Sequence, residues 1–169
     1  MKFCIFNSNN YPMKIVKKIA LALIVVFIGI QFYRPEKNTE KGDYTKDFFI
    51  ETNPSNEVKL IMKEACYDCH TNNTRYPWYN NIAPVSYWMA DHIRHGKGEL
   101  NFSKWNEYSN KKKAHKLEEV VEVIEDGEMP LKEYTWTHPE AKLTDLQKKA
   151  IIEWANGSRV LYQLNQQPK

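Results

Sequence analysis

The longest apolar stretch of the chain lies close to its N-terminus. Residues 19–30 (IALALIVVFIGI) carry no polar side chain, and Lys14, Lys17 and Lys18 stand immediately before them. Together with the flanking apolar and aromatic residues, about 19 positions form a run near the minimum length of a membrane-spanning helix. Lysines before such a run place its N-terminal end in the cytoplasm. We therefore expect residues 1–33 to be a transmembrane signal anchor, with the rest of the chain across the membrane.

Two other interpretations of this stretch are open. A cleaved signal peptide normally ends in small residues of the A-x-A kind, and Gln31 with the following Phe-Tyr-Arg-Pro offers none. A buried core helix would also be apolar on every face. Met13 begins a signal-like stretch, so translation could start there and leave Cys4 outside the protein. Residues 34–46 are polar and charged without periodicity, which predicts a tether.

Beyond residue 46, apolar side chains recur every three or four positions, the spacing typical of helices. Start and stop signals accompany these runs: Asn53-Pro54 can begin a helix, Thr144 with Gln147 can form a capping box, and Gly127 suits a helix C-terminus. No internal repeat and no sustained strand pattern occur. We therefore predict an all-α domain over residues 47–169. Its expected helices lie near residues 54–65, 84–96, 103–109, 114–126 and 144–157.

Two long loops separate these predicted helices. Residues 71–83 and 128–143 are rich in Asn, Pro and aromatic side chains, and they are long for so small a bundle. A domain of about 110 ordered residues with short helices also has a modest core. Both observations favour a large apolar prosthetic group at the centre, around which the loops are ordered.

One pentapeptide, Cys66-Tyr67-Asp68-Cys69-His70, carries recognisable chemistry. It has the C-x-x-C-H pattern by which c-type haem is attached. Two thiols three residues apart at a helix end can each form a thioether with one haem vinyl group, and the adjacent histidine then ligates the iron. We therefore predict one covalently bound haem c, with its iron, held by Cys66, Cys69 and His70.

Three other chemistries use two cysteines at this spacing. A thioredoxin-type redox pair expects a βαβ context, which the helical pattern does not offer. A zinc site needs further ligands, usually a second Cys/His pair. A plain disulfide between Cys66 and Cys69, with His70 incidental, is the third alternative.

A second axial ligand for the iron has to come from elsewhere in the chain, and Met129-Pro130 is the leading candidate. Met129 lies in a loop just past a predicted helix end, where its thioether is free to point at a metal. His138 belongs to the same loop system and is the main competitor. An open or water-bound sixth position is the other alternative. Arg75 could pair with a haem propionate, although a solvent-exposed arginine is the simpler interpretation.

The remaining histidines are explained more simply as surface residues. His92 and His95 are three apart on one predicted helix beside charged neighbours, and His115 lies in a cluster of lysines. Pro77 and Pro84 could shape the loop behind the motif histidine, where a carbonyl normally accepts the second ring N–H of a metal ligand.

The order of these features resembles that of class I cytochromes c: a helix leading into C-x-x-C-H, an intervening helix, a Met-Pro loop and a capped final helix with a Trp. More closely, CYDCHTNNTRYPWYNNIAPVSYW, LNFSKW, HKLEE…GEMPLKEYTWTHPEAKLTD and IIEWANG resemble the bacterial haem-binding domain family over about residues 47–160. The resemblance implies a cytochrome c-like helical domain around a single c-type haem. It also implies thioethers at Cys66 and Cys69, with His70 as the proximal and Met129 as the distal ligand.

The distribution of charge bears on the partners. The net charge is +3, and four of the 24 basic residues lie in the acid-free residues 1–33, which leaves 20 basic and 21 acidic residues in residues 34–169. A domain that is not basic is a poor candidate for nucleic-acid binding. The three cysteines are too few for a disulfide-stapled scaffold.

These patterns together favour a membrane-tethered monohaem cytochrome that transfers single electrons. Its expected partners are redox proteins and, through the N-terminal helix, the inner membrane, with the haem domain facing the periplasm or an equivalent compartment. No nucleophile–base pair, carboxylate dyad or phosphate-binding loop is evident, so we do not expect an enzyme. The alternatives are a haem-based sensor that binds a small ligand at an open sixth position and a peroxidase-like enzyme with distal acid–base groups.

Overall fold

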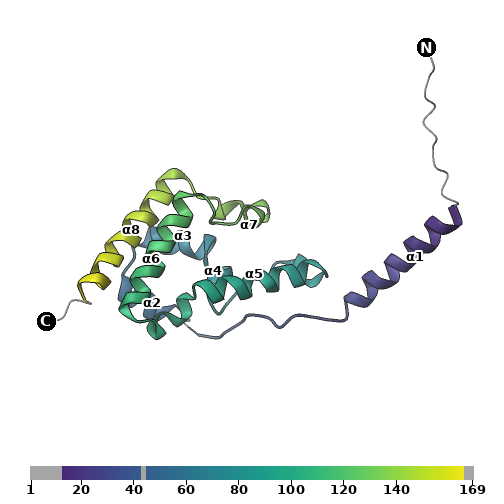
Figure 1. The fold of residues 1–169 in the computed structure, drawn as a ribbon, viewed down its shortest axis with the longest axis horizontal. Coiled ribbons are helices and arrows are strands. Elements are labelled where there is room, and N and C mark those ends of the chain that lie inside the picture. Colours follow the sequence, from purple (N-terminus) through teal and green to yellow (C-terminus); the bar gives the residue numbers. More distant parts are fainter. Residues whose placement is uncertain (1–12, 43–44, 166–169) are drawn as a thin grey trace, which may run out of the picture.

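A computed structural model describes residues 13–42 and 45–165, and every regular element in this part of the chain is a helix (Figure 1). The β-type pairing among these residues is an isolated bridge between Thr39 and Asn73. The all-α prediction is therefore confirmed for the described residues. The α-helices are α1 (Met13–Ile30), α2 (Lys46–Thr52), α3 (Asn56–Ala65), α4 (Tyr67–His70), α5 (Val85–Glu99), α6 (Asn110–Glu125), α7 (Lys132–Thr137) and α8 (Asp145–Leu164). The 3-10 helices are η1 (Trp78–Asn81), η2 (Phe102–Glu107) and η3 (Pro139–Ala141).

Local sequence signals set several helix ends. Thr144 and Gln147 form the predicted capping box at the start of α8. Gly127 follows the C-cap of α6 with a φ of 69°, a left-handed conformation that favours glycine. Asn53 does not cap α3 as predicted, because it adopts a left-handed conformation that ends α2. Ser55 caps α3 instead, and its side chain accepts a hydrogen bond from the first turn.

The main core lies where α6 and α8 pack side by side against α2, α3 and η2 (Figure 1). Phe48, Trp105 and Leu117 are almost completely buried there. The Phe48 and Trp105 rings meet edge-on with 5.0 Å between centroids, and the Trp105 indole N–H donates to the Tyr162 hydroxyl at 3.0 Å. This core fixes α3, which leads directly into the C-x-x-C-H motif.

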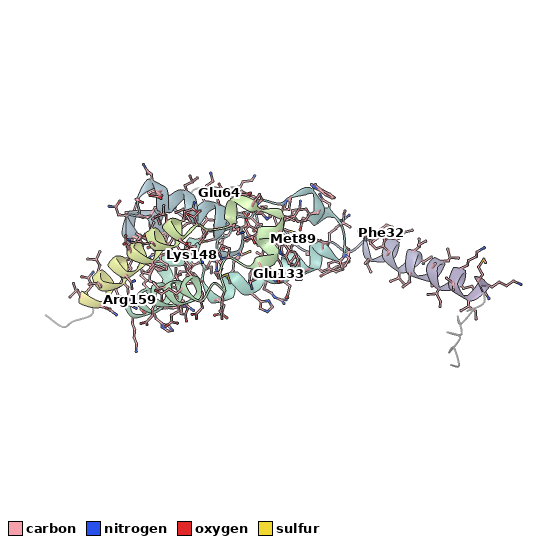
Figure 2. All side chains as sticks on the ribbon, turned by 90° about the horizontal axis from the view of Figure 1, so that it is seen from above. Phe32, Glu64, Met89, Glu133, Lys148 and Arg159 are labelled. Atoms are coloured by element: carbon pink, nitrogen blue, oxygen red, sulfur yellow. The ribbon has the colours of Figure 1, made fainter. Side chains whose placement is uncertain are left out.

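The structure overturns the prediction of a membrane-spanning N-terminal helix. Among the described residues, no helix combines the length and the apolar composition needed to cross a membrane. α1 ends at Ile30, so Phe32, which lies at the junction with the domain in Figure 2, does not extend it. The uncharged part of α1, residues 19–30, is about 18 Å long at 1.5 Å per residue, which is well short of a ~30 Å hydrocarbon core. Residues 1–12, with Cys4 and the alternative start of translation, lie outside the described residues.

The segment that follows α1 is hydrogen-bonded to the helical domain. The side chain of Gln31 donates to the carbonyl of Ala83 and accepts from its N–H, at 3.1 and 3.0 Å. Further along, the side-chain amide of Asn38 donates to the Thr71 carbonyl and to the Thr74 hydroxyl. Hydrogen bonds therefore hold part of this polar segment beside the loop that follows the motif.

Candidate functional site

A cavity of about 640 Å³ is lined by residues of the motif helix α4, of helices α3, α5, α6, α7 and α8, and of the chain that follows α6. Its volume falls within the range of about 300–1,000 Å³ that is typical of cofactor sites, and its walls are mainly apolar, as such sites usually are. The structure brings the four sequence-predicted site residues to this one cavity: Cys66, Cys69, His70 and Met129.

The motif begins where α3 ends. Cys66 is both the C-cap of α3 and the N-cap of α4. The backbone N–H groups of Cys69 and His70 both donate to the Cys66 carbonyl, at 3.3 and 3.0 Å. This tight turn brings both thiols and the imidazole to the cavity. The two cysteines are not joined to each other, so the disulfide alternative is not formed in this structure.

Burial keeps both thiols protonated at neutral pH. It raises the pKa of Cys66 from the usual 9.0 to about 12, and the charge of Cys69 acts in the same direction. It also raises the pKa of Cys69 to about 11, with a further contribution from the Asp68 carboxylate. Redox-active and metal-binding cysteines instead have lowered pKa values. In addition, the described residues contain no group of three or more His, Cys, Asp or Glu side chains that could hold a metal ion, so the zinc alternative lacks its further ligands there.

His70 is held from behind by the backbone. Its Nδ1 lies 3.0 Å from the carbonyl oxygen of Leu100, the residue that follows α5. Burial lowers the pKa of His70, while hydrogen bonds to the Leu100 and Gly96 carbonyls act in the opposite direction. The imidazole is therefore neutral at pH 7, with Nδ1–H donated to the backbone and Nε2 left for a metal. The carbonyl that supports His70 therefore belongs to Leu100 and not to the loop that contains Pro77 and Pro84.

Gly96 allows α5 to pack closely against the motif. A Cβ atom at this position would lie 2.8 Å from the carbonyl oxygen of Cys69 and 3.1 Å from its Cβ. The sequence predicts Gly96 as the end of this helix, but α5 continues to Glu99. Glycine is required at this position, because only a residue without a side chain allows the two backbones to approach so closely.

Met129 reaches the cavity from the end of α6. The backbone N–H groups of Glu128 and Met129 both donate to the Val123 carbonyl, at 2.9 and 3.0 Å. These bonds fold the chain back over the end of the helix, and Met129 and Pro130 line the cavity. The thioether and the His70 imidazole therefore come from two different walls, one formed by the chain between α6 and α7, the other by α4 and α5.

The competing histidines are placed differently. His138 is not among the residues that line the cavity, and its ring stacks on Tyr134 with 4.1 Å between centroids. His115 is exposed and pairs with a neighbouring glutamate. His92 and His95 line the cavity, which the interpretation as surface residues did not foresee for either of them. Nδ1 of His92 lies 2.9 Å from the Trp88 carbonyl oxygen, and the exposed His95 lies 3.2 Å from the Asp91 carboxylate.

A buried polar network surrounds Asp68, which the sequence-based prediction did not include. Oδ1 of Asp68 accepts from the backbone N–H and from Nε of Arg75, at 2.9 and 3.1 Å, and Oδ2 accepts from the Tyr134 hydroxyl at 2.6 Å. Burial lowers the pKa of the Arg75 guanidinium, but its hydrogen bonds to Asp68 and Glu64 outweigh this effect, so the pKa is raised overall. Arg75 is thus engaged with carboxylates beside the motif. The sequence signal for this network is the acidic residue, Asp68, inside the C-x-x-C-H motif.

The fold and the cavity together define a helical cofactor-binding protein. The cavity fits haem, because two buried thiols, a backbone-supported neutral imidazole and a thioether line apolar walls of suitable volume. Residues 25–157 match the haem-binding domain family. The chain belongs to this family, and the protein binds haem with its iron. No curated protein and no solved structure matches the chain.

Proposed function

We propose that the protein is a monohaem c-type cytochrome, similar in arrangement to class I cytochromes c, that transfers single electrons. The supporting observation is the convergence of Cys66, Cys69, His70 and Met129 on one cavity. Each thiol would add across one haem vinyl group, forming a C–S bond while its hydrogen moves to the adjacent carbon. The addition balances without an oxidant. Bound haem would supply a one-electron Fe(III)/Fe(II) couple.

His70 and Met129 are the proposed axial ligands. His70 suits this role because its imidazole is neutral and oriented by the Leu100 carbonyl. Met129 offers a soft thioether, and His/Met ligation raises the reduction potential relative to His/His. With a protein ligand from each wall, no coordination position is left for a substrate. We therefore propose an electron carrier and not an enzyme.

The proposed partners are redox proteins. Nucleic acid is a poor candidate, because residues 34–169 have no excess of basic side chains. Haem is joined to thiols in oxidising compartments outside the cytoplasm, so we propose that the haem domain lies there. This proposal rests on the cysteine chemistry alone, because no described helix can span a membrane.

Retention of haem after denaturation tests covalent attachment. Protein made with a c-type maturation system should keep its haem stain in a denaturing gel, and its mass should exceed the 20.0 kDa chain by one haem. The Cys66→Ala, Cys69→Ala double variant should lose the stain. Cys4→Ala is the matched control and should keep it. Complete loss of haem from the unmodified protein on denaturation would overturn covalent attachment and leave the family membership intact.

A further inference from the structure

A short hydrogen bond joins the C-x-x-C-H motif to the helix that follows Met129. Tyr134 lies on α7, and its hydroxyl donates to Oδ2 of Asp68 at 2.6 Å. Asp68 lies between the two motif cysteines and is buried. Both Tyr134 and Asp68 line the cavity. The bond therefore connects the wall that carries His70 with the wall that carries Met129.

Arg75 fixes the acceptor of this hydrogen bond. Its backbone N–H and Nε hold Oδ1 of Asp68, and Nη2 lies 3.2 Å from Oδ2. The guanidinium is itself held by the Glu64 carboxylate at 2.5 Å. A carboxylate bound on several sides cannot rotate to follow a moving donor. The hydrogen bond to Tyr134 therefore forms only when α7 is in place.

Movement of α7 would carry Met129 with it. Pro130 and Leu131 are the only residues between Met129 and the start of α7, and Leu131 is the N-cap of that helix. His138 stacks on the Tyr134 ring, and its Nδ1 lies 3.1 Å from the Tyr134 carbonyl. This stacking holds the Tyr134 ring in the orientation that presents its hydroxyl to the motif.

We propose that the hydrogen bond between Tyr134 and Asp68 is a latch that holds Met129 at the haem and so controls the access of external small ligands to the iron. Tyr134 is a positioning residue, because it acts through Met129. With this hydrogen bond broken, Met129 would be free to move away, and an external ligand such as imidazole would bind the iron in its place. The inference rests on the proposed axial role of Met129.

Imidazole affinity of the oxidised holoprotein, measured by visible spectroscopy, tests the latch. Losing a hydrogen bond to a charged group changes an equilibrium constant roughly ten- to hundredfold. Tyr134→Phe should therefore bind imidazole more tightly by that factor, and the weak far-red band from sulfur-to-iron charge transfer should fade in parallel. Tyr76→Phe is the matched control, because the Tyr76 hydroxyl accepts from the backbone N–H of Asn38 at 2.8 Å, away from α7, and Tyr76 does not line the cavity. It should leave the affinity unchanged.

A second background separates a latch from a direct effect on the cavity. In Met129→Ala the sixth position is open in any case, so adding Tyr134→Phe should not raise imidazole affinity further. Equal increases in both backgrounds, or wild-type affinity in Tyr134→Phe alone, would overturn the latch and leave the axial ligands intact. A wild-type protein without the far-red band that binds imidazole as tightly as Met129→Ala would overturn Met129 ligation, and the latch with it. Should Tyr134→Phe fail to fold, Asp68→Asn weakens the same hydrogen bond and should shift the affinity in the same direction.

Discussion

Replacing Gly96 with alanine tests whether the close approach of α5 to the motif matters for stability. The added Cβ would meet the carbonyl oxygen of Cys69 at 2.8 Å and the Cys69 Cβ at 3.1 Å. Neither atom can turn aside as the end of a flexible side chain can, so α5 has to move away. Overpacking of this kind costs about 1–3 kcal/mol. Alanine in place of glycine also favours the helix itself by about 1 kcal/mol, and a control has to separate the two effects.

Gly98→Ala provides that control within the same helix. A Cβ at Gly98 would meet nothing within 4 Å, so this variant should show only the helix preference. The free energies of unfolding of Gly96→Ala and Gly98→Ala should therefore differ by about 1–3 kcal/mol, with Gly96→Ala the less stable. Urea unfolding of the haem-containing protein, followed by far-ultraviolet circular dichroism, measures the difference. Equal stability of the two variants would refute the argument from close packing.

Three further predictions concern the ligand, the core and the thiols. Met129→Ala should remove the far-red band and let carbon monoxide bind the reduced holoprotein, whereas His138→Ala should change neither. An unaltered spectrum in Met129→Ala would move the assignment to a histidine, and tight carbon monoxide binding by the unmutated protein would favour the sensor alternative. Trp105→Phe leaves a core tyrosine hydroxyl without its indole partner and should lower the free energy of unfolding by about 1–3 kcal/mol. Its control is Trp78→Phe, which lies at a 75% exposed position and should change the free energy of unfolding by less than about 0.5 kcal/mol. With pKa values raised to about 12 and 11, the motif thiols of the haem-free protein should react slowly with iodoacetamide at pH 8 and faster as pH rises, because only the thiolate reacts; rapid labelling at pH 8, mapped by peptide mass, would contradict their burial.

The parts of the site that were predictable from the sequence are those that local chemistry determines. Covalent haem attachment fixes both the residue types and their spacing, so Cys66, Cys69 and His70 stand out in the sequence. Met129 was identifiable because a helix stop, Gly127, lies two residues before it. The capping box at Thr144 was identifiable for the same reason, because both of its members lie within one helical turn.

The interactions that support these residues join segments that are distant in the sequence. The carbonyl of Leu100 behind His70 and the hydroxyl of Tyr134 on Asp68 have no local signature, since any residue has a carbonyl and the chain has ten tyrosines. Gly157 shows that a distant contact can also override a local signal. It suits a helix end locally, but α8 continues past it, because Tyr162 in its last turns is buried in the core.

The error at the N-terminus has a similar origin. The estimate of about 19 spanning residues required the helix to continue through Gln31 into the aromatic residues beyond. The structure ends α1 at Ile30, and the Gln31 side chain bonds the backbone of Ala83 instead. A tertiary contact thus shortens a helix that apolar composition alone would extend.

The two walls of the cavity are held by different kinds of interaction, and this difference sets the order in which the site can change. On one wall, Gly96 packs against the Cys69 backbone and the Leu100 carbonyl holds His70, so neither contact is lost unless α5 moves as a whole. The Met129 wall is joined to the motif through a side-chain hydrogen bond from the Tyr134 hydroxyl, which breaks when α7 moves away. Two thioethers would also tie the haem to the α4 wall. With the proposed ligands, coordination should therefore change first at Met129, while His70 and the haem stay in place.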